Sequence, residues 1–111
     1  MNSKLGSEFS TEDERALELT ARLCQSLTHP FRLKLIHILE NGPKNVSQIE
    51  TETNRPQPFI SQHLRVLREK GIVDCERNKN EVHYKLINRR ILEICRMVAE
   101  LAMAKETPSD G

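Results

Sequence analysis

The sequence has few glycines, few cysteines and no long apolar run, and each shortage excludes a class of protein. Only four glycines occur in 111 residues. Neither G-x-G-x-x-G nor G-x-x-x-x-G-K-[ST] is present, which argues against a glycine-rich phosphate-binding loop. The three cysteines are widely spaced and odd in number, so they do not form a disulfide framework. No run of about 18 apolar residues and no basic-then-apolar leader is found, so we expect a cytoplasmic protein without a membrane partner.

The chain also lacks the residue patterns of an enzyme. It contains no recognisable nucleophile–base pair and no carboxylate dyad, so we expect neither catalysis nor a cofactor. Its length fits one small domain. A domain of this size buries only roughly 65% of the surface that its unfolded chain exposes, and a partner subunit would therefore add stability.

The net charge of +1 conceals an uneven distribution of charge along the chain. Residues 1–53 carry six basic and eight acidic groups, and residues 91–111 carry two and four. Residues 54–90 carry nine basic and four acidic groups, a net charge of +5. A local excess of this kind is the electrostatic footprint expected of a segment that binds a polyanion.

Apolar residues recur every three or four positions in five segments, which indicates five helices. We place the cap of the first helix at Thr11, because acidic residues follow it. Pro30 suits the first position of the second helix, and Asn41-Gly42-Pro43 stops that helix. The other predicted helices cover residues 46–53, 57–70 and 88–104, after a first helix over residues 11–27.

The period of the apolar pattern changes from 3.6 to 2 after Gly71. Residues 72–77 can form one strand, and residues 81–86 alternate cleanly between apolar and polar side chains. The intervening residues 78–80 then form the tip of a hairpin. The sequence therefore predicts a mainly α fold with a small two-stranded β-hairpin.

The two ends of the chain are predicted to lie outside the folded domain. Residues 1–10 show no periodicity and are interpreted as a disordered leader, either native or translated from cloning-vector sites. Residues 105–111 contain proline and glycine and are expected to fray. The folded domain is therefore placed at residues 11–104.

The fourth predicted helix has the two faces that a DNA-reading helix needs. Ile60, Leu64 and Leu67 form an apolar stripe, and polar side chains occupy the opposite side. A major groove about 12 Å wide admits one α-helix, which must pack one side against its own domain and present hydrogen-bonding groups on the other. Two short helices before it and a hairpin with a basic tip after it indicate a winged helix-turn-helix.

Three stretches of the sequence also resemble a known family. They are LTHPFRL at 27–33, QPFISQHLRVLREKGIV at 57–73 and VHYKL at 82–86. They look like the entry to the second helix, the recognition helix and the second wing strand of the ArsR/SmtB winged-helix repressors. The likeness covers residues 16–104. It implies a homodimer that pairs through its first and last helices, binds inverted repeats in double-stranded DNA, and releases them when an inducer binds.

The resemblance also implies which residues touch DNA. Gln57, Ser61, Gln62 and Arg65 match recognition-helix positions, and Gln and Arg can read base edges with two hydrogen bonds. The alternative interpretation is an ordinary solvated helix face, and for the hairpin tip an exposed basic turn. His63 lies beside the apolar stripe and is interpreted as a packing or phosphate-contacting residue. The predicted DNA-binding residues are Gln57, Ser61, Gln62, His63, Arg65, Arg68, Arg77 and Lys79.

Pairing through the first and last helices would use the apolar stripes of those helices. The side chains on these stripes are predicted to form the dimer interface. They are Leu17, Leu23, Cys24, Leu27, Ile91, Ile94, Cys95, Val98 and Leu101.

The metal boxes of the family are missing from this sequence. Residues 45–50 contain no thiol or imidazole, and residues 88–101 contain no Asp or His, so we expect no metal site. Cys24 and Cys95 have two open interpretations. They are either small buried apolar residues or a thiol sensor of oxidants, persulfides or arsenite. The sequence does not name the inducer.

These observations predict a sequence-specific transcriptional regulator, most simply a repressor. The alternative is a winged-helix module that binds proteins and no operator, although such a module has no need of the +5 segment. One departure from the family affects the recognition helix. Pro56 stands where the family commonly has a capping Ser or Thr, which leaves the aim of Gln57 open.

Overall fold

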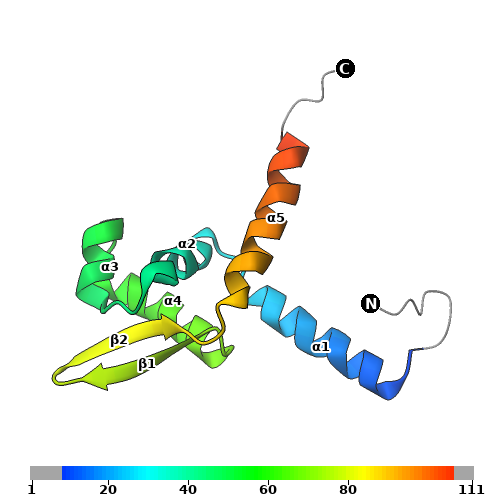
Figure 1. The fold of residues 1–111 in the computed structure, drawn as a ribbon, viewed down its shortest axis with the longest axis horizontal. Helices are drawn as coiled ribbons and strands as arrows, with labels where there is room; N and C mark the ends of the chain where they lie inside the picture. The colour runs from blue at the N-terminus through cyan, green and yellow to red at the C-terminus, as the bar shows by residue number, and fades with distance from the viewer. Residues whose placement is uncertain (1–8, 107–111) are drawn as a thin grey trace.

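The computed structural model describes residues 9–106, in which five α-helices and one antiparallel hairpin follow one another (Figure 1). Helices α2, α3 and α4 gather beside the hairpin, whereas α1 and α5 extend away from this group. The predicted fold class, a winged helix-turn-helix, is confirmed. The elements are α1 Thr11–Gln25, α2 Pro30–Ile38, a 3-10 turn at Leu39–Asn41, α3 Val46–Thr53, α4 Gln57–Glu69, β1 Val73–Asn78, β2 Glu81–Leu86 and α5 Arg90–Glu106.

Both ends of the domain differ from the prediction. The cap of α1 is Ser10 and not Thr11: the Ser10 hydroxyl accepts a hydrogen bond from the Asp13 amide at 3.1 Å, and the Ser10 amide donates to the Asp13 carboxylate at 3.0 Å. The two hydrogen bonds form a reciprocal capping box, so Ser10 caps the helix and Thr11 is its first helical residue. Helix α5 includes Lys105 and Glu106, two good helix formers that were assigned to the tail. Residues 1–8 and 107–111 lie outside the described part of the chain.

The two helices before α4 are delimited by side chains that complete their first turns. The His29 imidazole accepts from the Phe31 amide at 3.1 Å and so caps α2. Asn45 and Gln48 form a capping box at the start of α3. Asn54 ends α3 with φ at 57°, a left-handed conformation that asparagine tolerates. The chain can therefore turn sharply from α3 into α4.

The first strand of the hairpin extends one residue further toward the tip than the sequence predicts. Asn78 pairs with Glu81, so the loop contains only Lys79 and Asn80, and Lys79 adopts a φ of 62°. Ile72, predicted to begin the strand, is instead buried in the core with 3% of its surface exposed. At the other side of β2, Tyr84 exchanges two backbone hydrogen bonds with Lys44, at 2.8 and 3.0 Å. These bonds join the hairpin to the segment between α2 and α3.

The core lies under α4 and fixes how this helix is oriented. Ile60, Leu64 and Leu67 are wholly buried, which confirms the predicted apolar stripe. Burying each such side chain stabilises the fold by about 1.5–3 kcal/mol. Because the buried stripe sets the rotation of α4 about its own axis, the opposite face is directed to solvent. The other wholly buried apolar residues are Leu35, Ile36, Ile49 and Val73.

Helices α1 and α5 expose apolar side chains that have no cover within the chain. No residue of α1 is buried, and in α5 burial is confined to its first two turns. Leu17 is 51% exposed, Val98 58% and Leu101 75%. Exposed apolar residues concentrated on two projecting helices mark a surface for protein association. None of the described helices is long and apolar enough to cross a membrane.

Candidate nucleic-acid interface

The solvent-facing side of α4 carries the polar residues predicted to read DNA. Gln57, Gln62 and Arg65 are exposed and Ser61 is half-buried. A shallow depression along this face is lined by Pro58, Ser61, Gln62 and Arg65, which stand at positions i, i+3, i+4 and i+7 and therefore share one side of the helix. The structure thus brings the predicted base-reading residues together on one accessible surface.

The start of α4 is well defined although it has no capping hydroxyl. Pro56 is the cap, in an extended conformation with φ −70° and ψ 151°, and its carbonyl accepts from the Phe59 and Ile60 amides at 3.1 and 3.2 Å. Pro58 has no N–H to donate. Within residues 9–106 the Gln57 amide therefore remains the one first-turn donor of α4 without a hydrogen bond. It is free to meet an anion at the helix N-terminus.

The basic residues after α4 have two different surroundings. The Arg68 guanidinium lies 3.6 Å from the Asp74 carboxylate, an exposed pair that links the end of α4 to β1. Arg77 and Lys79 are exposed on the distal half of the hairpin and form no ion pair among the described residues. Their charges are therefore more available to an external phosphate than that of Arg68.

His63 lies on a different side of α4, against α2. Its ring centroid is 4.3 Å from that of His29 and 4.7 Å from that of Phe59. Burial, and then the charges of His29, Arg32 and Arg55, lower the pKa of His63. Its Nδ1 atom is buried and has no hydrogen-bond partner. His63 thus belongs to a cluster of aromatic and cationic side chains and does not lie with the base-reading residues.

Sequence reasoning missed this α2–α4 cluster. We use that name for His29, Arg32 and Phe31 from the start of α2, Arg55 from the loop before α4, and Phe59 and His63 from α4. The available signal was the recurrence of ring-bearing residues at the starts of two helices that the helix-turn-helix motif packs together.

The lowered pKa of His63 makes stability depend on pH. The unfolded chain binds a proton near pH 6.5, whereas the folded state resists protonation because His63 is partly buried and its neighbours are cationic. The unfolded state therefore holds more protons as pH falls, so the free energy of unfolding should be smaller at pH 5.5 than at pH 7.5. Urea unfolding at both pH values measures this difference.

His63→Gln should reduce that pH dependence, because it removes the proton-binding group from the cluster. His37→Gln, at an exposed position outside the cluster, serves as the matched control and should leave the dependence nearly unchanged. An equal pH dependence in His63→Gln and in the unmodified protein would contradict the assignment.

The predicted dimer-interface residues divide into two groups. Leu17, Cys24, Ile94, Val98 and Leu101 are exposed, and Leu23 and Leu27 are partly buried. Ile91 and Cys95 are each 7% exposed and pack in the core of the chain itself. Ile91 and Cys95 thus contribute to the core of the chain itself, because the first two turns of α5 cover the core before the helix projects outward. Their place in a dimer interface stays a prediction.

The two cysteines proposed as a thiol sensor have unlike environments. Burial raises the pKa of the Cys95 thiol, which disfavours the reactive thiolate. Cys24 is exposed. The interpretation of Cys95 as a small apolar core residue therefore gains support. Among residues 9–106, no group of three His, Cys, Asp or Glu side chains is positioned to hold a metal ion.

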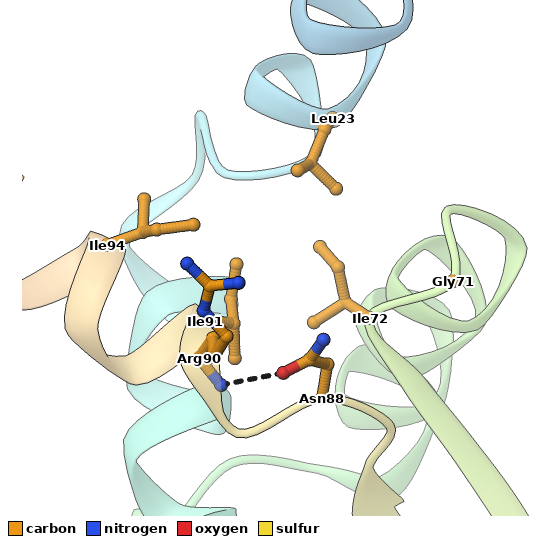
Figure 2. A pocket seen from close by; sticks show the side chains of 7 residues that line it. All are labelled: Leu23, Gly71, Ile72, Asn88, Arg90, Ile91 and Ile94. Carbon is orange, nitrogen blue, oxygen red and sulfur yellow. Dashed lines mark hydrogen bonds between the residues drawn. The ribbon is translucent and has the colours of Figure 1, made fainter. Parts of the chain in front are cut away.

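A cavity of about 330 Å³ lies where α1, the turn after α4 and the start of α5 converge. Figure 2 shows Leu23, Ile72, Ile91 and Ile94 around it, with Arg90 beside them. Its rim is held by the Asn88 side chain, which accepts from the Arg90 amide at 2.9 Å. A small molecule in this cavity would touch both the α4–hairpin unit and the two projecting helices.

Comparisons with known proteins agree with this geometry. The family model described as "Bacterial regulatory protein, arsR family" matches residues 29–74. The biofilm growth-associated repressor of Xylella fastidiosa is 35% identical over 94 residues, which cover 85% of this chain and 82% of that protein. The crystal structure of the transcriptional repressor BigR from Xylella fastidiosa is similar with a TM-score of 0.69 and 33% identity, covering 90% of this chain and all of that one.

A second solved structure is similar in fold. It is the homodimeric winged helix-turn-helix DNA-binding domain from Mycobacterium bovis, with a TM-score of 0.74 and 23% identity. The match covers 86% of this chain and 89% of that one. At this identity the likeness concerns the fold alone.

Proposed function

Because the chain belongs to the ArsR family of bacterial transcriptional regulators, we propose that it is a repressor that binds an inverted-repeat operator in double-stranded DNA as a homodimer. The observation that carries this proposal is the division of α4 into two faces. Ile60, Leu64 and Leu67 are wholly buried, while Gln57, Gln62 and Arg65 are exposed. The helix is thus held rigidly from behind and presents side chains that can form paired hydrogen bonds to base edges.

The mechanism follows from the positions of α4 and the hairpin. Helix α4 enters a major groove, and the hairpin lies beside it, so that Arg77 and Lys79 meet backbone phosphates. In a two-fold symmetric dimer, two copies of α4 occupy successive major grooves. The operator is then an inverted repeat with half-sites one helical turn apart, or a multiple of it.

The exposed apolar residues of α1 and α5 support the homodimer. On pairing, apolar surface would be removed from water at Leu17, Ile94, Val98 and Leu101. An inducer bound where these helices meet the α4–hairpin unit would change the spacing of the two α4 helices and so release the operator. The cavity beside Leu23 and Arg90 lies at that junction.

The direct test is binding to the promoter upstream of the protein's own gene over a range of salt concentrations. A protein held by 6–10 phosphate contacts loses about 10³–10⁵ in affinity between 50 and 200 mM salt. We expect a steep loss of this kind, and tighter binding to the promoter duplex than to a scrambled duplex of equal length. A flat salt response with no mobility shift would favour the alternative, a winged-helix module that binds only proteins.

Replacing Arg65 or Arg77 by alanine should change DNA binding in different ways. Arg65→Ala should lose discrimination at one base position of each half-site, worth about 1–3 kcal/mol, because Arg65 lies on the groove-facing side of α4. Arg77→Ala should weaken binding to all sequences alike and lower the salt slope. Competition with duplexes that vary one base at a time separates these patterns. Equal losses across all sequences for Arg65→Ala would assign Arg65 to a phosphate.

A further inference from the structure

The loop between α3 and α4 holds an arginine over an aromatic ring. The guanidinium carbon of Arg55 lies 3.8 Å from the centre of the Phe59 ring and 5.8 Å from that of Phe31. A cation–π contact of this kind restrains the position of the guanidinium. It leaves the N–H groups at the outer edge of the guanidinium free to form two parallel hydrogen bonds to an oxyanion.

The charges around Arg55 are of one sign. Burial, and then the charges of His29, Arg32 and Arg55, lower the pKa of His63, so both arginines lie close to its ring. Some other cations do have carboxylate partners, as in the pairs Lys44–Glu52 and Lys85–Glu76. Within residues 9–106 no carboxylate lies within ion-pair distance of Arg32 or Arg55.

Two polar atoms of this cluster have no internal partner. Arg32 Nε and His63 Nδ1 are both buried without a hydrogen bond in the described structure. Within residues 9–106 the Arg32 side chain forms a single hydrogen bond, to the Thr28 hydroxyl at 3.4 Å. A cluster that holds two arginines, has no carboxylate within ion-pair distance of them and leaves the buried Arg32 Nε–H unpaired has the properties of an anion site.

The position of Arg55 indicates which anion this would be. Arg55 lies two residues before the first residue of α4, and the neighbouring Gln57 amide is also without a partner in residues 9–106. When α4 enters a major groove, its N-terminal end lies close to the DNA strand that borders the groove. The oxyanion nearest to Arg55 would then be a backbone phosphate.

We propose that Arg55, held by Phe59 and backed by the charge of Arg32, binds a backbone phosphate of the operator at the edge of the groove that α4 enters. This assignment rests on the proposed function, since it requires that α4 binds duplex DNA. It adds a sequence-independent contact to the base-reading face. That contact also fixes the position of the N-terminal end of α4 along the groove.

The test compares Arg55→Gln with the unmodified protein on the promoter duplex and on a scrambled duplex. Each lost phosphate contact lowers the slope of log Kd against log salt by about 0.9, so a dimer should lose about 1.8. Loss of a hydrogen bond to a charged group should weaken binding about tenfold per site, equally on both duplexes. Arg55→Lys should keep most of the slope and lose part of the affinity, because lysine keeps the charge and loses the paired geometry.

The matched control is Lys105→Gln, which removes the same charge at the last turn of α5, away from α4 and the hairpin (Figure 1). It should leave the slope and the affinity unchanged. The proposal is overturned if Arg55→Gln keeps the slope of the unmodified protein. It is also overturned if Arg55→Gln weakens binding only to the promoter duplex, since that pattern marks a base contact.

A second measurement keeps this site separate from the proposed function. Inorganic phosphate is titrated into the DNA-free protein while the Arg55 Nε–H and Gln57 amide signals are followed by NMR. Phosphate-dependent shifts that are absent in Arg55→Gln support the site even if no duplex binds, in which case the proposed function alone fails. If the Arg55 and Gln57 signals do not shift at a phosphate concentration that shifts the signals of other basic residues, the site is contradicted.

Discussion

Replacing Val98 and Leu101 together by glutamate is expected to make the protein monomeric and to weaken operator binding by about 10²-fold or more. Both side chains are more than half exposed on α5, where they have no cover within the chain. Four charged groups in the dimer would meet at the pairing surface and could not be desolvated there. Once the subunits separate, each half-site is bound independently, and the gain of about 10²–10⁴ from linked binding is lost. Sedimentation and promoter binding measure the two effects.

The control for this variant is Arg96→Glu. It changes the charge of the chain by the same two units, and Arg96 is exposed about half a turn away from Val98 on α5. Arg96→Glu should remain dimeric, and circular dichroism should show that both variants keep their helices. A double variant that sediments as a dimer and binds the promoter normally would show that these helices are not the pairing surface.

Leu64→Ala is expected to lower the free energy of unfolding by about 2–5 kcal/mol. Leu64 is wholly buried and lies at the centre of the stripe that fixes α4 against the core. A domain of this kind is stable by about 5–15 kcal/mol in total, so the loss is a large share of its stability. The expected result is a clear reduction in the urea concentration at the midpoint of unfolding.

Leu64→Met provides the matched control, since it keeps most of the buried volume and should cost less than about 1.5 kcal/mol. At a temperature where Leu64→Ala is still folded, its operator affinity should stay within a few-fold of normal, because Leu64 touches no base. A loss of affinity without a loss of stability would mean that Leu64 acts directly in DNA binding.

The sequence predicts well those elements whose own residues show a periodic apolar pattern. The stripe of Ile60, Leu64 and Leu67 defines α4 because three residues at helical spacing suffice to indicate its buried side. The alternation in residues 81–86 similarly defines β2. The division of α4 into a buried and an exposed face, on which the proposed function depends, was therefore predictable from one segment alone.

The features that escaped prediction depend on contacts between segments. The α2–α4 cluster joins residues from three separate places, and no periodicity relates Arg55 to Phe59 or His63 to His29. For the same reason the sequence does not divide the apolar stripe of α5 between the core of the chain and a partner. The stripe does not reveal that Cys95 faces the core while Val98, less than one turn later, does not.

The lack of any buried residue in α1 has a consequence for how much active repressor a cell contains. An isolated helix of about 15 residues is marginal in water, so in the proposed homodimer the second subunit would supply much of the order of α1. By mass action, that order rises with the concentration of the chain. A higher concentration of the protein then increases operator occupancy and also increases the fraction of subunits in which α1 is ordered. When growth dilutes the protein, repression should therefore decline more than in proportion to its concentration.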